Sequence, residues 1–236
     1  IRAANSGAKV LSGSIGRPDQ SHGYEYMKAV FRSSAVRDTM DVVSVQVHHS
    51  GPDVTRVENA IRRAQGVARG KPVWITETSV PSEGRHFWMT EEWQAEMVFR
   101  SYVTALRLGV ERLFWGSLIE SDSGADATRE SRSLLQWHAS GESREKASSK
   151  AFRILADLLE GADWSGVKSL DPEGGRGVTI DRKGHLVYGE TKWVVVPKGS
   201  FSSAVDLFTG ESVEWELRTR DSVAINTQEK TVWLKP

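Results

Sequence analysis

Short apolar runs alternate with amphipathic segments along the first 160 residues of the chain. The clearest run is residues 41–48, where valines alternate with polar residues at the period of two that is typical of a strand. The clearest amphipathic segment follows it, because apolar residues recur at steps of three and four between Val54 and Ala68 before Gly70. The pattern therefore predicts strands and helices that alternate along this part of the chain.

Four such strand–helix units are predicted. The strands are expected at residues 8–11, 41–48, 73–76 and 111–117, and the helices at residues 22–36, 54–68, 90–108 and 149–160. Because each connection contains a helix, the strands should be parallel. Their spacing suits an α/β barrel or a doubly wound sheet. No Gly-x-Gly-x-x-Gly or Walker loop follows the first strand, which disfavours the nucleotide-binding folds.

The pattern changes after residue 161. Short β-branched runs separated by turn residues predict an antiparallel β-module. Its strands are expected at residues 177–180, 185–188, 191–196, 203–208, 211–216, 222–225 and 231–234. The sequence therefore predicts two domains, residues 1–160 and residues 161–236.

A carboxylate directly behind an apolar strand is the main candidate for chemistry. Residues 73–76 (Val-Trp-Ile-Thr) are β-branched or aromatic, Pro72 precedes them, and Glu77 follows before a loop that contains Pro81. Catalytic groups project from this end of the strands in α/β barrels. From spacing alone two interpretations stay open: Glu77 is catalytic, or it caps the next element or pairs with an arginine.

The amino-acid composition disfavours several classes of binding partner. Lys+Arg and Asp+Glu both number 31, so the net charge is zero, which disfavours nucleic acid or an anionic membrane as the main partner. The sequence has no run of membrane-spanning length and no cysteine. The pair His48-His49 lacks a third ligand at a usual spacing, so we expect no metal and no cofactor. Of the nine tryptophans, most should lie in the core, and one or two could stack on sugars.

Taken in order, these segments resemble the catalytic barrel of retaining β-glycoside hydrolases, the clan with catalytic glutamates on strands four and seven. Residues 74–77 are similar to the strand-seven nucleophile motif, residues 43–49 to strand six, and residues 112–117 (Arg-Leu-Phe-Trp-Gly-Ser) to strand eight. The β-module is similar to that of xylosidase-, iduronidase- and arabinofuranosidase-like members. The implied fold class is α/β: a partial TIM barrel, strands 5–8 of a (β/α)8 barrel, followed by a small antiparallel β-sandwich module.

The resemblance implies a carbohydrate substrate and roles for five residues. Glu77 would be the nucleophile that attacks the anomeric carbon. Gln46, His48 and His49 would donate hydrogen bonds at the substrate site, and Trp115 would stack on the sugar ring. Structural alternatives stay open for the histidines, as turn or interior residues, and for Trp115, as a core residue.

One feature of the clan is absent from the sequence. The acid/base glutamate normally follows an Asn at the end of strand four, and no Asn-Glu dipeptide occurs here. By the order of elements, that strand would precede Ile1. We therefore expect a fragment of a retaining O-glycosyl hydrolase that is inactive alone. It should self-associate through open barrel edges or pair with a missing N-terminal half.

Two other classes of protein were weighed. A non-catalytic carbohydrate-binding or interaction protein derived from a glycosidase would keep the same strands and tryptophans. A different barrel enzyme, such as an aldolase or a metal-dependent hydrolase, is disfavoured because the sequence offers no strand-end lysine and no His-x-His cluster.

Overall fold

The computed structural model describes residues 5–49, 51–83, 86–120, 131–137, 142–163, 166–199, 201–228 and 230–236. The chain forms two compact units. The first consists of Ile1–Met89 and Leu108–Ser143, and the second of Thr90–Arg107 and Arg144–Pro236. The second unit thus includes two helices that the sequence assigns to the barrel half. The domain boundary at residue 160 stays a prediction.

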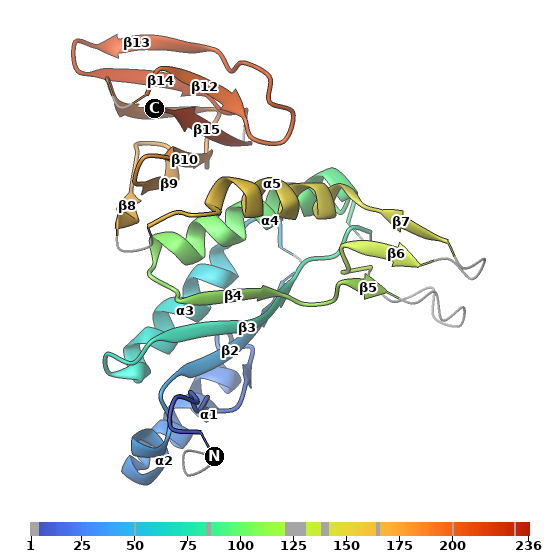
Figure 1. Cartoon of the computed structure of the whole chain (residues 1–236), viewed down its shortest axis with the longest axis vertical. Helices are drawn as coiled ribbons and strands as arrows, with labels where there is room; N and C mark the ends of the chain where they lie inside the picture. The colour runs from blue at the N-terminus through green and yellow to red at the C-terminus, as the bar shows by residue number, and fades with distance from the viewer. Residues whose placement is uncertain are drawn as a thin grey trace. The chain divides into compact units, whose positions relative to one another are not determined.

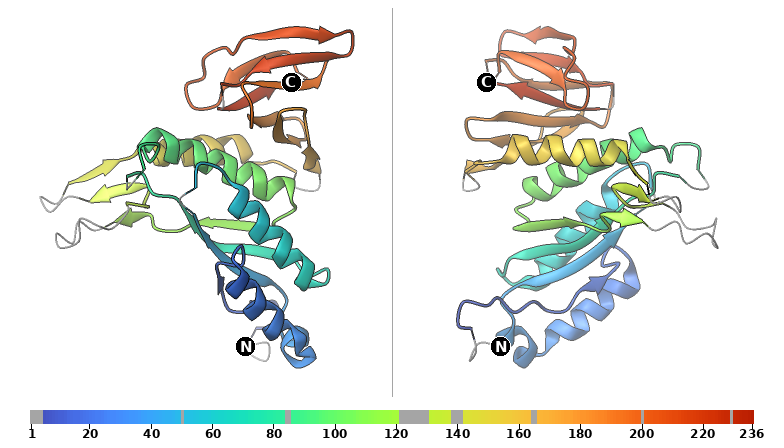
Figure 2. Two further views of the ribbon diagram at one scale, coloured as in Figure 1. Left: turned by 180° about the vertical axis from the view of Figure 1, so that it is seen from behind. Right: turned by 45° about the vertical axis from the view of Figure 1, so that its right-hand side comes forward.

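The first unit is built on a parallel sheet in the order β1-β2-β3-β4, as the alternating pattern predicts. Helices α1 and α3 lie on the same side of this sheet (Figure 2). The strands are β1 (Ile15–Gly16), β2 (Val43–His48), β3 (Val73–Ser79) and β4 (Arg112–Trp115), and the helices are α1 (Ser21–Arg32), α2 (Ser34–Thr39) and α3 (Thr55–Ala68).

Two short strands follow this sheet in the chain, β5 (Ile119–Glu120) and β6 (Leu135–Trp137), and they pair in parallel. The next strand is β7 (Ser143–Glu145). Residues 121–130, between β5 and β6, lie outside the described residues.

The alternation of β2 explains how the sheet acquires two different faces. Val43, Val45 and Val47 are completely buried, and so are Val57 and Ile61 of α3, which packs against β2. The residues between the valines therefore point to the opposite face. This is the face on which Gln46 and His48 lie.

The first strand and the first helix differ from the prediction. Residues 8–11 contribute only an isolated bridge between Leu11 and Val42, and the strand itself begins at Ile15, after Gly13 turns the chain at a φ of 77°. The predicted helix 22–36 is two helices, because Ser33 is extended and caps α2 through its hydroxyl.

Helix α1 approaches the end of β1 very closely. A Cβ atom on Gly23 would lie 2.2 Å from the carbonyl oxygen of Arg17. That oxygen accepts a hydrogen bond from the Gln20 amide at 3.0 Å. Gly23 therefore allows the helix to pack on the turn that follows β1.

The second unit combines two helices with antiparallel strands. Helices α4 (Glu91–Arg107) and α5 (Ala147–Leu159) run side by side (Figure 1). The strands are β8 (Lys168–Leu170), β9 (Gly175–Ile180), β10 (Gly184–Gly189), β11 (Trp193–Pro197), β12 (Ser203–Asp206), β13 (Trp215–Thr219), β14 (Ser222–Asn226) and β15 (Thr231–Lys235).

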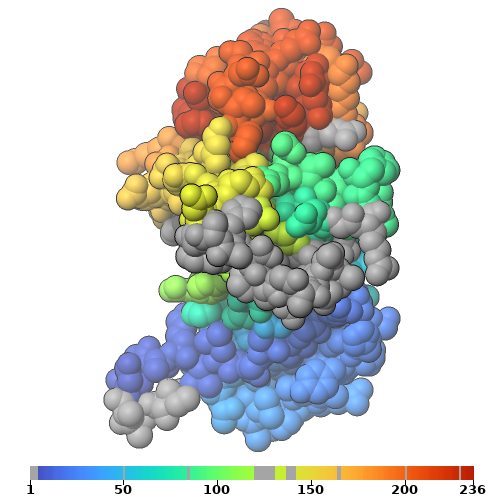
Figure 3. All heavy atoms as spheres, turned by 90° about the vertical axis from the view of Figure 1, so that its right-hand side faces the viewer, coloured from blue at the N-terminus to red at the C-terminus, as the bar shows by residue number. Residues whose placement is uncertain are grey.

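These strands form two antiparallel sheets, in the orders β12-β15-β10-β9-β8 and β11-β14-β13. Both sheets contribute to one buried cluster, for example Val187 and Leu234 from the first and Val194 and Ile225 from the second. The space-filling view shows these strands, coloured orange to red, as one closely packed mass (Figure 3). The predicted strand 211–216 begins later, at Trp215.

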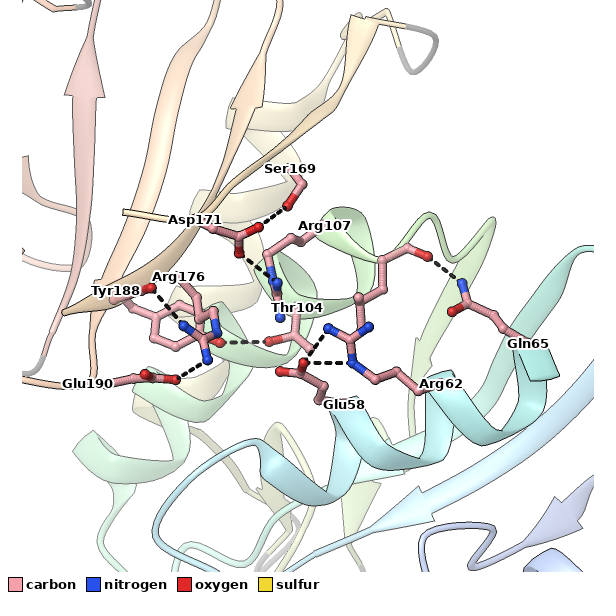
Figure 4. Close-up of polar contacts among 12 residues, drawn as sticks. Glu58, Arg62, Gln65, Thr104, Arg107, Ser169, Asp171, Arg176, Tyr188 and Glu190 are labelled. Atoms are coloured by element: carbon pink, nitrogen blue, oxygen red, sulfur yellow. Dashed lines mark hydrogen bonds and ion pairs between the residues drawn. The ribbon is translucent and has the colours of Figure 1, made fainter. Parts of the chain in front are cut away.

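Polar side chains connect α4 to the strands of this unit. The Arg107 guanidinium donates to Asp171 at 2.7 Å, and the hydroxyls of Thr104 and Tyr188 lie 3.0 Å apart (Figure 4). The partly buried carboxylate of Glu96 accepts hydrogen bonds from Arg100 at 2.7 Å and from the hydroxyl of Thr231 at 2.8 Å. Burial raises the pKa of Glu96 above its ordinary value of 4.5, although both partners favour the ionised form.

Substitution of Gly23 tests the contact between α1 and the turn after β1. Gly23→Ala should destabilise the protein by about 1–3 kcal/mol in urea denaturation, because the methyl group overlaps a backbone oxygen. Gly66→Ala is the matched control, since Gly66 is also helical but its Cβ would meet nothing within 4 Å. It should stabilise by about 0.5–1 kcal/mol. Equal changes in the free energy of unfolding for the two variants would contradict the close approach of α1 to the turn after β1.

The raised pKa of Glu96 predicts how the second unit responds to pH. A group whose pKa is raised on folding stabilises below its unfolded pKa, and this contribution is lost as the pH rises through the folded value. Amides of α4 and β15 should therefore exchange hydrogen more slowly at pH 5 than at pH 8, after correction for intrinsic rates. The difference should be smaller in Glu96→Gln. The prediction would be wrong if these amides exchanged more slowly at pH 8 than at pH 5 and Glu96→Gln removed that difference.

Candidate active site

A β-bulge in β3 decides which way Glu77 points. Val45 pairs with Ile75, but the next residue of β2, Gln46, pairs with Glu77, so Thr76 is the extra residue. Without this insertion the alternation of side chains would send Glu77 to the helix-covered face together with Ile75. The Thr76 hydroxyl donates to the Val45 carbonyl at 3.2 Å, which satisfies a backbone acceptor beside the bulge.

The bulge brings three of the predicted site residues together. The amide nitrogen of Gln46 donates to one oxygen of Glu77 at 3.0 Å. Nε2 of His48 lies 3.1 Å from the other oxygen. The Glu77 side chain remains 41% exposed. A half-exposed carboxylate with a donor on each oxygen is held in one orientation, as a nucleophile must be.

His48 is oriented by a second contact on its other side. Its Nδ1 lies 2.7 Å from the hydroxyl of Ser79. Burial lowers the pKa of His48, and the nearby cations Arg132 and Arg17 lower it further, while the Glu77 carboxylate raises it. In the neutral ring that this direction favours, Nε2–H donates to Glu77 and Nδ1 accepts from Ser79.

The residue that follows β4, Gly116, lies against Glu77, whereas Trp115 of the strand itself does not pair with it. A Cβ atom on Gly116 would lie 2.4 Å from Cγ of Glu77. The register pairs Trp115 with Thr78, whose side chain is buried. The Trp115 indole N–H donates to the carbonyl oxygen of Arg132 at 3.2 Å. The role of Trp115 as a sugar platform stays a prediction.

Arg132 links the ends of β2 and β3. Its guanidinium donates to the carbonyl oxygens of His49 and Ser79, at 3.4 and 3.3 Å. These residues directly follow or end the strands that carry His48 and Glu77. Arg132 therefore fixes the spacing of the two strand ends and places a positive charge near the site.

His49 lies in a different environment from His48. Its side chain is 1% exposed, and neither ring nitrogen has a hydrogen-bond partner among the described residues. Burial lowers the pKa of His49 to about 4, so the ring is neutral at neutral pH. The predicted contact between His49 and a substrate stays a prediction.

The sequence analysis did not select Arg17, Ser79, Gly116 or Arg132. Ser79 and Gly116 could have been selected from their position in the sequence, since each stands two residues or fewer from a predicted site residue at the end of a strand. No sequence pattern marks Arg17 or Arg132 as part of the site, because both lie in segments without periodicity.

Metal and membrane features were also assessed. Among the described residues there is no group of three or more His, Asp or Glu side chains arranged to hold a metal ion. Within the same residues, the helices are too short or too polar to cross a membrane.

A parallel β/α sheet that presents a carboxylate at its carboxyl end is typical of barrel hydrolases. The model of the family described as glycosyl hydrolase catalytic core matches residues 1–137, more than half of the chain. The chain belongs to this family, which confirms the predicted class of glycoside hydrolase. No curated protein sequence matches significantly.

Several solved structures match the chain at low sequence identity. A family 39 glycoside hydrolase from the gut symbiont Bacteroides cellulosilyticus WH2 matches with a TM-score of 0.67 and 13% identity, over 100% of this chain and 52% of that one. SrfJ from Salmonella typhimurium matches at 0.45 and 12%, over 90% and 44% of the two chains. A GH39 β-xylosidase from Caulobacter crescentus matches at 0.44 and 15%, over 83% and 39%.

The first match shows that the chain shares its fold with part of a TIM-barrel glycosidase. The chain spans about half the length of that relative.

The electrostatics of the site can be tested through His48. Its imidazole pKa, followed by NMR, should rise in Arg132→Gln, which removes a neighbouring cation, and fall in Glu77→Gln, which removes the neighbouring anion. Arg132→Lys retains the positive charge and should stay nearer to the unsubstituted protein. Shifts in the same direction for the two glutamine variants would contradict the described arrangement.

Proposed function

We propose that Glu77 is the nucleophile of a retaining glycoside hydrolase. The observation that carries the proposal is the bulge, which turns this carboxylate toward Gln46 and His48 in a chain of the glycosyl hydrolase catalytic core family. Glu77 would attack the anomeric carbon and form a covalent glycosyl-enzyme. Gln46 and His48 would keep it aligned.

The second carboxyl group of this mechanism would come from outside these 236 residues. Retaining hydrolysis needs an acid/base carboxyl about 5–5.5 Å from the nucleophile. Among the described residues, the hydrogen-bond partners of the Glu77 side chain are an amide and an imidazole, and the sequence contains no Asn-Glu pair. We infer that the chain alone hydrolyses ordinary glycosides poorly, since loss of the acid typically removes about 10²–10⁴-fold in rate.

The finer assignment of the fold belongs to the same proposal. Strands β1 to β4 would be strands 5–8 of a (β/α)8 barrel, and the two antiparallel sheets would be the β-sandwich module of a xylosidase- or iduronidase-like enzyme. The open edges at β1 and β4 would pair with the rest of the barrel or with a second copy of the chain. Gln46, His48, His49 and Trp115 would contact the carbohydrate.

The nucleophile can be tested without the acid. In a 2,4-dinitrophenyl 2-deoxy-2-fluoroglycoside the leaving group needs no protonation, and the fluorine slows the release of the glycosyl-enzyme. With a panel of xylosyl, glucosyl and arabinofuranosyl reagents, we expect one adduct per chain, located on the Glu77 peptide by mass spectrometry. Glu77→Gln should abolish it, and Glu83→Gln, an exposed glutamate just beyond the strand, should not.

Two results would overturn the assignment. An adduct on another residue, or none with any reagent, would show that Glu77 is not a nucleophile. If glycan binding also survived Glu77→Ala, the non-catalytic alternative would replace it. Fast hydrolysis of ordinary aryl glycosides by the chain alone, lost in Glu77→Gln, would refute the inferred need for an external acid.

A further inference from the structure

Arg17 stands at the carboxyl end of β1, on the same edge of the sheet as Glu77. Its amide donates to the Gln46 carbonyl at 3.1 Å, and the side chain of Gln46 holds Glu77. Because β1 and β3 are separated only by β2, their backbones lie about 10 Å apart. A sugar bound at Glu77 would therefore have Arg17 within reach of its substituents.

The backbone of Arg17 is held in a conformation that arginine disfavours. Its φ is 51°, in the left-handed region, and Pro18 further disfavours helical backbone angles there. Three contacts keep it so: its amide bonds to Gln46, its carbonyl accepts from Gln20, and Gly23 leaves room for that carbonyl. Strain of this kind concentrates at functional sites, where the surrounding structure maintains it.

The Arg63 side chain fixes the same turn from α3. Its guanidinium donates to the carbonyl oxygens of Pro18 and Asp19, at 3.1 and 2.6 Å. The turn after β1 is thus anchored to a neighbouring strand and to two helices. Its conformation does not depend on the Arg17 side chain, which is exposed and has no hydrogen bond or ion pair with any described residue.

Among the described residues, more cations than anions act strongly on the ring of His48. Two guanidinium groups, Arg17 and Arg132, act on His48, whose ring is neutral, while Glu77 is the anion that acts on it. The guanidinium of Arg132 is engaged with two backbone carbonyls. Of these two, Arg17 is therefore the cation that a ligand can reach, and a guanidinium suits bidentate contact with a carboxylate or a sulfate.

We propose that Arg17 binds an anionic substituent of the sugar held at Glu77, so that the site takes acidic glycans. The shared chemistry is a carboxylate or a sulfate ester. The proposal rests on the proposed function insofar as it takes the Glu77 edge of the sheet as the glycan site.

Equilibrium binding of uncleaved sugars tests this without requiring catalysis. The 236-residue chain would be titrated by NMR with methyl β-D-glucuronide, methyl β-D-glucoside and methyl β-D-glucoside 6-sulfate. We expect the anionic sugars to bind about tenfold more tightly than the neutral one. The preference should fall as salt is raised, because an exposed ion pair is screened. The uronide and the sulfate arms identify which anion the site prefers.

Two matched substitutions separate the charge of Arg17 from its backbone conformation. Arg17→Asn removes the cation but keeps a residue that tolerates the left-handed region, so the fold should be retained and the anionic preference lost. Arg69→Asn makes the same change at an exposed arginine with a φ of 50°. Arg69 follows α3, at the opposite end of the strands, and its substitution should leave the preference unchanged.

The outcomes distinguish this proposal from the nucleophile assignment. Equal affinity for neutral and anionic sugars, an anionic preference that survives Arg17→Asn, or no sugar binding at all would overturn the role of Arg17. Loss of the preference in Arg17→Asn alone supports it. Adduct formation at Glu77 reports separately on the nucleophile, so either conclusion can fail while the other stands.

Discussion

The insertion of one residue, Thr76, into β3 is the constraint on which the candidate site depends. Side chains of a strand alternate between faces, so one extra residue exchanges the faces of everything beyond it. Before the bulge, Ile75 packs into the apolar core; beyond it, Glu77 joins Gln46 and His48 on the open face. The same strand thus supplies a buried anchor and an accessible carboxylate within three residues.

The polar residues around the bulge hold this arrangement from both sides. The hydroxyls of Thr76 and Thr78 donate to carbonyls of β2, at 3.2 and 2.8 Å, so the two strands remain joined where their register shifts. Beyond the bulge, Ser79 orients His48 and Arg132 joins the strand ends. The orientation of Glu77 therefore depends on side chains that donate hydrogen bonds to backbone carbonyls of the two strands. Without these donors the carbonyls would have to be hydrogen-bonded by water.

The sequence was sufficient to predict the helices and strands that are marked by a local pattern of residues. Helix α3 was predictable because its apolar spacing and Gly70 both mark it, and β2 because its valines alternate. The identity of Glu77, Gln46 and His48 as neighbours followed from the parallel order of β2 and β3. The bulge was not predictable from the sequence. An unpaired residue interrupts the alternation of side chains along a strand, and the sequence pattern does not show where that interruption lies.

The arginines illustrate a second limit. Arg17 and Arg132 lie in irregular segments, where position is set by tertiary hydrogen bonds rather than by periodicity, and no spacing rule relates residue 132 to residues 49 and 79. The grouping of α4 with the C-terminal strands is similar, because Glu96 and Thr231 are joined across 135 residues of sequence. Long-range polar contacts of this kind leave no trace in local composition.

Gly116 has a consequence for how such a protein can lose its chemistry while keeping its shape. Any other amino acid there would drive a carbon atom into the methylene of Glu77, so the carboxylate would swing away from both of its donors with every ionisable group still present. Under the proposed function, a single nucleotide change at this codon would be enough to produce an intact but inert descendant. Inspection of the acidic residues alone would not reveal the difference.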